Sequence, residues 1–211
     1  MDLTAAQSPS PRPQVADRLR AAARLEFSGR GYHGARVLAI ARRAGCNVAL
    51  LYRHWDSKRA LYLDVLRAVW RGVVEDAGRA IDAGGGPEAL VIACLDANLH
   101  DPMGARIILR ELLDGGPVLS SMVAAEPALL EPIRRAALAL QPASDAVEPT
   151  MAVLAIGGLA ALLASAQDSV RTLLPEPVTP ERWRAEACAL LLRGVAGAGG
   201  AGARPPRAAM G

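Results

Sequence analysis

The sequence predicts an all-α protein of about nine to ten helices, and three observations lead to that fold class. Apolar residues make up 52% of the 211 residues, whereas aromatic residues make up only 3%, so the core must be built mainly from Ala, Leu, Val and Ile. Strands favour aromatic and β-branched side chains, and this composition therefore favours helices. Apolar residues recur at helical spacing between glycine and proline stops, and no segment shows the alternation of a strand.

Three short helices are expected near the N-terminus. The first has apolar residues at helical spacing and ends near Gly31. The second has an apolar stripe over 37–44 and is stopped by Gly45. Asn47 is the expected N-cap of the third helix, which continues to about His54.

Glycine and proline divide the rest of the chain into further helices, because proline suits the first helical position and disrupts a helix interior. In chain order we expect a long helix capped by Asp56 or Ser57, helices that begin at Pro87, Pro102 and Pro117, interruptions at Pro127 and Pro132, a helix through Leu140, a long apolar helix over 147–173, and a last helix opened by Thr179 and ending near Gly194.

The distribution of charge divides the chain into a basic head and a mildly acidic body. The first 60 residues hold eleven basic and four acidic side chains, whereas the rest holds thirteen basic and seventeen acidic ones. We expect a flexible arm over 1–13, a helix-turn-helix domain over 14–60, a second helical domain over 61–196 and a disordered tail over 197–211. The basic first third predicts that the head binds a polyanion.

The cysteines, the N-terminus and the missing motifs exclude several other classes of protein. The three cysteines are far apart, which excludes a disulfide framework and fits a reducing cytoplasm. No signal-peptide pattern opens the chain, and the most apolar run, 151–164, is shorter than the roughly 20 residues of a membrane span. The sequence carries no nucleophile, phosphate-binding or metal motif, so we expect no enzyme activity, no cofactor and no metal.

The segment 31–61 has the pattern of a helix-turn-helix. Residues 44–47 join two short helices, and a turn of that length with a glycine inside it lets the helices cross steeply. The second helix would then enter the major groove of DNA. Donors suited to phosphate oxygens lie on or beside this helix, namely Tyr52, Arg53, His54, Lys58 and Arg59.

The run GYHGARVLAIARRAGCNVALLYRHWDSKRAL resembles the DNA-binding segment of TetR-family transcriptional regulators. The matching residues are Phe27, Gly31, Tyr32, Val37, Ile40, Ala41, Ala44, Gly45, Leu51, Tyr52, His54, Trp55 (usually Phe), Ser57, Lys58 and Leu61. The resemblance implies a ligand-binding and dimerisation domain after the head. It also implies a dimeric repressor that binds a palindromic operator in double-stranded DNA and is released by a small-molecule effector.

The resemblance implies phosphate contacts for Tyr52, His54 and Lys58. Family members usually carry Thr or Ser at the start of the second helix, where this chain has Ala35 and Arg36. A hydroxyl cap is therefore missing, and Arg36 could replace the phosphate contact but not the cap.

The recognition helix departs from the family pattern in its exposed positions, Val48, Ala49 and Leu50. Apolar side chains cannot hydrogen-bond base edges, although they can pack on thymine methyl groups. Direct readout of bases would therefore depend mainly on Asn47 and Arg53. We expect modest sequence preference and a steep dependence of DNA affinity on salt.

The body has no aromatic residue over 87–145, so a ligand site there would be aliphatic and its effector lipophilic. The expected lining residues are Tyr62, Trp70, Leu95, Ile108, Leu112 and Met122. The last two long helices are apolar nearly all round and must be buried, either against a second copy of the chain or inside a monomer. The alternative function is an all-helical ligand-binding or interaction protein whose head has weak or lost DNA recognition.

Overall fold

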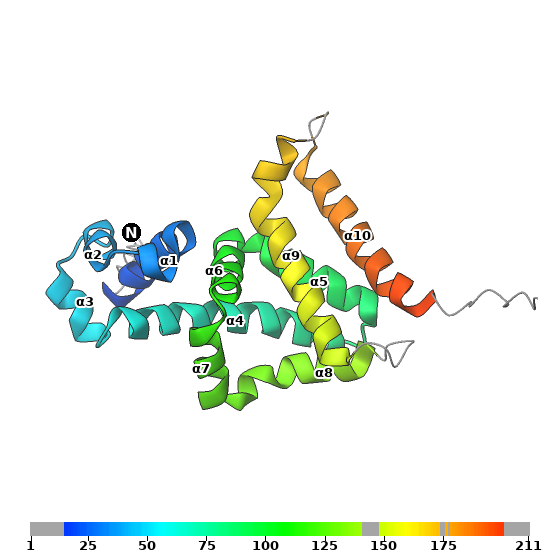
Figure 1. Ribbon diagram of the computed structural model, residues 1–211, viewed down its shortest axis with the longest axis horizontal. Helices are drawn as coiled ribbons and strands as arrows, with labels where there is room; N and C mark the ends of the chain where they lie inside the picture. The colour runs from blue at the N-terminus through cyan, green and yellow to red at the C-terminus, as the bar shows by residue number, and fades with distance from the viewer. Residues whose placement is uncertain (1–14, 141–147, 174–175, 177, 201–211) are drawn as a thin grey trace, which may run out of the picture. The chain divides into compact units, whose positions relative to one another are not determined.

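The computed structural model describes residues 15–140, 148–173, 176 and 178–200. Within these ranges the chain forms ten α-helices and one short 3₁₀ helix, and it contains no strand (Figure 1). The predicted all-α class is therefore confirmed. The expected arm over 1–13 and the tail from residue 201 lie outside the described residues. The chain divides into two compact units, Met1–Tyr62 and Leu63–Gly211.

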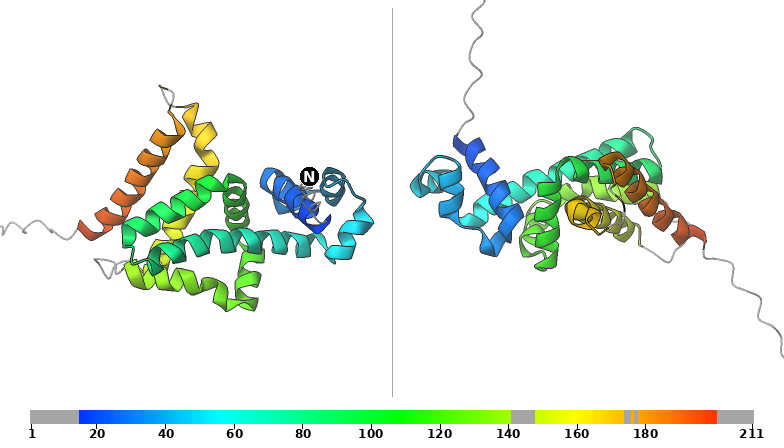
Figure 2. Two further views of the ribbon diagram at one scale, coloured as in Figure 1. Left: turned by 180° about the vertical axis from the view of Figure 1, so that it is seen from behind. Right: turned by 90° about the horizontal axis from the view of Figure 1, so that it is seen from above.

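The N-terminal unit is built from α1 (Val15–Gly34), α2 (Val37–Arg43), α3 (Val48–His54) and the first turn of α4 (Lys58–Asp82) (Figure 2). The backbone leaves the helical conformation inside α1 at Gly31, whose φ is 66°. A side chain rarely adopts that conformation, which explains the glycine. The break lies where the sequence predicts the first helix to end.

Aromatic rings form part of the core of the N-terminal unit. The Phe27 and Tyr62 rings meet edge to face with their centroids 4.8 Å apart, and the Tyr32 ring lies 5.0 Å from the Tyr62 ring. Leucine and isoleucine side chains from all four helices complete this core, namely Leu19, Ile40, Leu51 and Leu61. Tyr62 is thus a core residue of the N-terminal unit, which corrects its expected place in the lining of a ligand site.

The C-terminal unit contains the rest of α4 and the helices that follow it. These are α5 (Pro87–His100), α6 (Pro102–Leu113), α7 (Pro117–Ala125), the 3₁₀ helix η1 (Pro127–Leu130), α8 (Glu131–Leu140), α9 (Pro149–Arg171) and α10 (Pro180–Gly200). The expected helix starts at Pro87, Pro102 and Pro117 are confirmed. The last helix continues to Gly200, beyond the expected end near Gly194, so residues 197–200 are helical.

Helix α9 is the centre of the C-terminal unit. It contacts α5, α6, α8 and α10, and it crosses α5 in Figure 1. Ala161 and Ala164 of α9 are buried against Ala105 of α6, and these small side chains let the two helices approach closely. Leu99 and Leu109 pack around this cluster.

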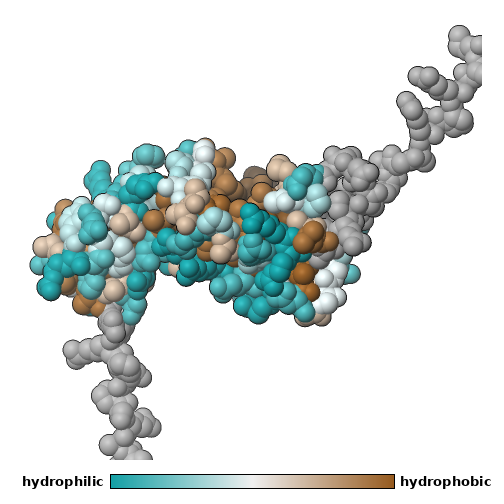
Figure 3. Space-filling model, turned by 90° about the horizontal axis from the view of Figure 1, so that it is seen from below, coloured by the Kyte–Doolittle hydropathy of each residue, from teal (hydrophilic) through white to brown (hydrophobic). Residues whose placement is uncertain are grey.

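Helix α9 begins and ends two residues inside the expected range 147–173, and it is less buried than the sequence predicts. By length and composition alone, its 23 residues are enough to cross a membrane, whereas the apolar run noted in the sequence covers only 151–164. Of the most apolar part of the helix, 28% is buried. Leu154, Leu159 and Leu162 are exposed on it. The single chain therefore buries one side of this helix and leaves the other side exposed. In the space-filling view, hydrophobic residues reach the surface in several places among hydrophilic ones (Figure 3).

Candidate nucleic-acid interface

The turn between α2 and α3 is held by backbone hydrogen bonds and one side-chain cap. The Gly45 N–H donates to the Arg42 carbonyl at 3.1 Å, and the Cys46 N–H donates to the Ala41 carbonyl at 3.0 Å. The left-handed φ of Gly45, 67°, allows this reversal. The Leu50 N–H then donates to Asn47 Oδ1 at 2.8 Å, so the predicted cap of the third helix is confirmed.

Helix α3 has one buried face and one exposed face. Leu51 is fully buried and anchors the helix, while Trp55 is buried just after it. Of the expected DNA-binding residues, those exposed are Arg36, Asn47, Ala49, Tyr52, Arg53 and His54, and those half-buried are Val48, Leu50 and Lys58. The exposed face of α3 thus combines small apolar side chains with a tyrosine, an arginine and a histidine.

Basic side chains surround this face within the N-terminal unit. Arg42 and Arg43 are exposed at the end of α2, and Arg59 is exposed at the start of α4. Basic residues at the last turn of α2 also suit the negative end of the helix dipole. Together with Arg36 and Arg53 they give the unit a positively charged surface, which attracts a polyanion.

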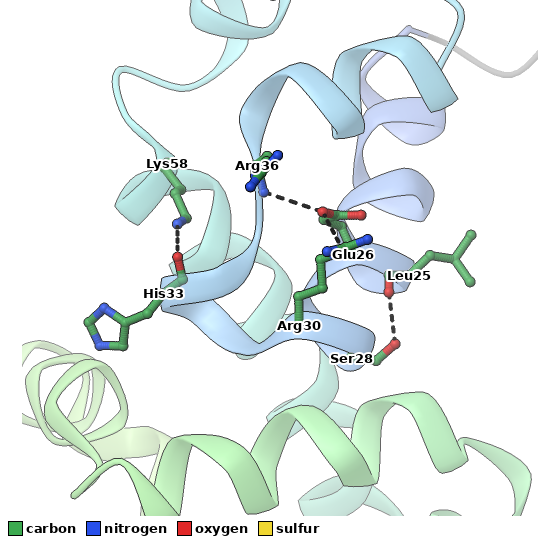
Figure 4. Close-up of polar contacts among 7 residues, drawn as sticks. All are labelled: Leu25, Glu26, Ser28, Arg30, His33, Arg36 and Lys58. Carbon is green, nitrogen blue, oxygen red and sulfur yellow. Dashed lines mark hydrogen bonds and ion pairs between the residues drawn. The ribbon is translucent and has the colours of Figure 1, made fainter.

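Lys58 is the first residue of α4, and its ammonium group is held close to the end of α1. Its Nζ donates to the His33 carbonyl at 3.3 Å (Figure 4). The same Nζ lies 4.8 Å from the centre of the Tyr32 ring. Ser57 caps the helix, because its Oγ accepts the Ala60 N–H at 3.0 Å. Partial burial lowers the pKa of Lys58 from its ordinary value of 10.5.

Sequence reasoning missed one residue of this unit, Glu26 on α1. Its carboxylate is buried and accepts the Arg36 N–H at 3.3 Å, and the Arg30 Nε lies 3.3 Å from the same oxygen (Figure 4). Arg36 itself makes no side-chain cap at the start of α2. Two features of the sequence could have identified Glu26. It is a lone carboxylate in the apolar stripe of α1, and the helix that follows has no hydroxyl side chain at its start.

The residues expected to line a ligand site are not all brought together. Trp70, Leu95, Ile108 and Met122 are buried in the C-terminal unit, and the Trp70 indole N–H donates to the Leu129 carbonyl at 3.2 Å. Leu112, by contrast, is 47% exposed. A side chain that faces solvent to this degree adds little to an enclosed site.

Two polar residues of α5 that could meet a ligand have different surroundings. Asp96 forms a two-pronged ion pair with Arg184 of α10, with N···O distances of 2.6 and 2.7 Å. The Asn98 side chain is buried, and its amide donates to the Cys94 carbonyl at 2.7 Å. Within the described part of the chain, the Asn98 Oδ1 accepts no hydrogen bond.

Comparison with known proteins places the N-terminal unit in a family. Residues 19–65 match the family of bacterial regulatory proteins called the tetR family. The HTH-type transcriptional activator FasR from Mycolicibacterium smegmatis (strain ATCC 700084 / mc(2)155) is 37% identical over 102 residues, which cover 46% of this chain and 47% of FasR. The match therefore spans about half the length of that curated relative.

Solved structures share the fold over most of the chain. The putative transcriptional regulator SCO4942 from Streptomyces coelicolor is 22% identical, with a TM-score of 0.58, and covers 84% of this chain and 96% of its own. The transcriptional regulator FadR from Bacillus subtilis, solved in complex with stearoyl-CoA, is 14% identical, with a TM-score of 0.62, and covers 86% and 98%. The helix-turn-helix, the match over residues 19–65 and the identity with FasR agree, and the N-terminal unit is a helix-turn-helix domain of the tetR family.

Proposed function

We propose that this cytoplasmic regulator binds a palindromic operator as a homodimer, represses transcription there, and leaves the DNA when a lipophilic effector binds its body. The observation that carries the DNA-binding part is the exposed face of α3, capped by Asn47, anchored by Leu51 and surrounded by exposed arginines. A capped helix with a basic surround suits insertion into a major groove.

Base readout would come from few polar groups. The Asn47 Oδ1 already caps α3, so only its amide N–H groups remain to meet a base. Asn47 therefore cannot make the two-pronged contact to adenine that needs both the oxygen and the nitrogen. Arg53 can make a two-pronged contact to guanine, and Ala49 can pack on a thymine methyl group. Sequence preference would then be set mainly by Arg53.

A mobility-shift titration tests this part of the proposal. The full chain is titrated against a duplex from the DNA beside its own coding region and against a scrambled duplex, each at two salt concentrations. We expect tighter binding to the first duplex, and a fall in affinity of about a hundredfold or more between low and moderate salt. Equal, salt-insensitive binding to both duplexes would support the alternative, a helical ligand-binding protein whose head does not read DNA.

The repressor direction needs its own test, because the relative FasR is named a transcriptional activator. The promoter beside the coding region is fused to a reporter and measured with and without the regulator. Repression predicts higher reporter output in the deletion strain and return to the lower level on complementation. Lower output in the deletion strain would show an activator.

The dimer would form through α9 and α10. Leu154 and Leu162 of α9 and Leu190 of α10 are exposed apolar residues on the last two long helices. Gly157 and Gly158 have nothing within 4 Å of a Cβ added to them, so a second copy of α9 could approach closely there. A pair of such helices from each subunit makes a symmetric four-helix interface.

The proposed effector has a long aliphatic chain. Most buried residues of the body over 87–138 are aliphatic, including Leu90, Leu95 and Ile107, and FadR was solved with stearoyl-CoA. The unpaired Asn98 Oδ1 would accept a hydrogen bond from a polar group of the ligand.

Thermal unfolding with a ligand panel tests the effector class. The panel holds a saturated long-chain acyl-CoA, the matching free fatty acid and planar aromatic compounds. We expect stabilisation by the acyl ligands and release of the duplex at the same concentrations, since a ligand that binds the folded state stabilises it. Stabilisation by the aromatic compounds alone would overturn the aliphatic proposal.

A further inference from the structure

Glu26 is a buried carboxylate in the unit that binds DNA. It is 6% exposed, between the core residues of α1. A buried charge costs several kcal/mol unless it is paired and hydrogen-bonded. An apolar side chain at this place would avoid that cost, so the carboxylate must supply an interaction that an apolar residue cannot.

The contacts of Glu26 lead to the start of α2. Its Oε1 accepts the Arg36 N–H at 3.3 Å and lies 3.3 Å from the Arg30 Nε (Figure 4). Arg36 is the N-cap of α2, and its own side chain caps nothing. Ala35, immediately before it, has no hydroxyl to offer. Glu26 is therefore the acceptor that α1 supplies to the N-cap residue of α2.

This arrangement resembles a capping box whose carboxylate comes from the preceding helix. In a capping box a Glu or Gln inside the helix accepts the N–H of the N-cap residue. A negative charge near the helix N-terminus is also favoured by the helix dipole. Helix α2 has only seven residues and would be marginal without such support. The Arg30 guanidinium balances the charge of Glu26, which limits its repulsion of a phosphate.

We propose that Glu26 is a positioning residue for DNA binding, which fixes the backbone of Arg36 so that the exposed Arg36 guanidinium is presented to a DNA phosphate. The inference rests on the proposed function, because Arg36 acts on DNA only if the N-terminal unit binds a duplex. The carboxylate replaces the hydroxyl that family members usually carry at the start of this helix.

A set of variants of the full chain tests the proposal. Glu26→Gln keeps an oxygen acceptor and removes the charge, whereas Glu26→Leu keeps the volume and removes the acceptor. Asp17→Asn is the matched control, because it removes a carboxylate charge from the exposed part of α1, where Asp17 pairs with Arg20. Each is combined with Arg36→Ala, and affinity for the duplex beside the coding region is measured across a salt series.

We expect Glu26→Gln to bind like the Asp17→Asn control, within about twofold, and Glu26→Leu to bind about tenfold more weakly with a salt slope lower by about one. Arg36→Ala should cause a similar loss and should add nothing in the Glu26→Leu background, because residues that act through each other are not additive. Additive losses, or an unchanged salt slope in Glu26→Leu, would overturn the proposal.

Amide exchange provides a measurement that does not depend on the leucine variant. In the wild-type chain and in Glu26→Gln, the Arg36 N–H should be protected like the Ala35 N–H, which donates to the Gly31 carbonyl at 3.2 Å. Exchange of the Arg36 N–H at the rate of a free amide would overturn the proposal. Failure of the wild-type chain to bind any duplex would instead overturn the proposed function.

Discussion

Lys58 is the single lysine in a chain with 24 lysine and arginine residues, and it illustrates how one side chain can combine several interactions. Its ammonium group lies between the His33 carbonyl and the Tyr32 ring. A compact ammonium can meet both partners and still present a hydrogen to a phosphate, because it has three donors. An arginine carries its charge on a planar, extended head and would meet these partners in a different geometry.

Replacing Lys58 is expected to weaken DNA binding in a charge-dependent way. Lys58→Ala should lower affinity for every duplex and reduce the salt slope by about one. Because burial lowers the pKa of Lys58 below 10.5, its positive charge is present at low pH and is lost as pH rises through that lowered value. Lys58→Arg should therefore lose less affinity than the wild type as the pH is raised.

The measurement is a fluorescence anisotropy titration at matched ionic strength from neutral to alkaline pH. Lys58→Arg serves as the internal control for the titration of tyrosines, which both proteins share. Parallel loss of affinity in the two proteins would contradict a contribution from the charge of Lys58.

The reactivity of Cys94 should reflect its burial. Burial raises the pKa of the Cys94 thiol to about 12, and only the thiolate reacts with alkylating reagents. At pH 8 about one thiol in ten thousand is then ionised. We expect iodoacetamide to label the half-buried Cys46 and Cys188 first, as followed by peptide mass spectrometry of the native chain. Equal labelling of all three without denaturant would contradict this.

At the scale of helices, two buried glutamates perform the same task in different units. Glu26 of α1 accepts the N–H of Arg36, the N-cap of α2, and Glu111 of α6 accepts the Val118 and Leu119 N–H groups of α7 at 2.7 and 2.9 Å. The residue before α7, Gly116, has no side chain to cap it. In both places a short helix receives its capping acceptor from the helix before it.

Removing the Glu111 acceptor should destabilise the C-terminal unit. Glu111→Leu leaves two N–H groups near the start of α7 without their partner, which is expected to lower the free energy of unfolding by about 2 to 3 kcal/mol. Glu111→Gln keeps one acceptor oxygen and should cost less. Urea unfolding followed by circular dichroism measures both. An equal fall in the free energy of unfolding in both variants would indicate that the charge of Glu111, and not its hydrogen bonds, stabilises α7.

Asn47 should contribute to helix stability and to DNA binding by separate atoms. Asn47→Ala removes the cap of α3 and is expected to lower the free energy of unfolding by about 1 kcal/mol. Asn47→Asp keeps the capping oxygen but loses the amide donors and adds a negative charge beside the DNA. It should therefore unfold like the wild type and bind DNA more weakly. Thermal unfolding and duplex titration separate the two effects, and wild-type affinity of Asn47→Asp would exclude a DNA contact.

At the scale of the whole molecule, the exposed side of α9 is the surface that a monomer leaves open and that a dimer would cover. Leu162 is 50% exposed in the single chain, although the helix contacts four others. Apolar side chains repeated along a long helix are usually covered by a partner. A second copy of the chain would cover them and would also place two recognition helices on one duplex.

Charges on this side of α9 should dissociate the proposed dimer. Leu154→Glu with Leu162→Glu is expected to give a monomer in sedimentation velocity, and duplex affinity should fall because two half-sites can no longer be bound together. Leu113→Glu is the matched control, since Leu113 is 85% exposed on α6 and outside the proposed interface. A variant that remains dimeric would show that α9 does not form the interface.

The local features of this protein could be predicted from the sequence because short-range chemistry determines them. Asn47 and Thr179 were identified as caps and Pro87, Pro102 and Pro117 as helix starts, since each acts within one helical turn. The helix-turn-helix could be identified for the same reason, because a glycine turn between two apolar stripes lies within a short segment.

Pairings between distant residues could not be predicted in this way. The spacing of residues does not show that Glu26 meets the start of α2, that Tyr62 packs with Phe27, or that Arg184 pairs with Asp96, because these contacts arise only when helices pack. The exposure of Leu162 likewise depends on which neighbours cover α9. Hydrophobic periodicity reports that a face is apolar, whereas three-dimensional packing establishes which apolar faces the same chain covers and which it leaves open to a partner.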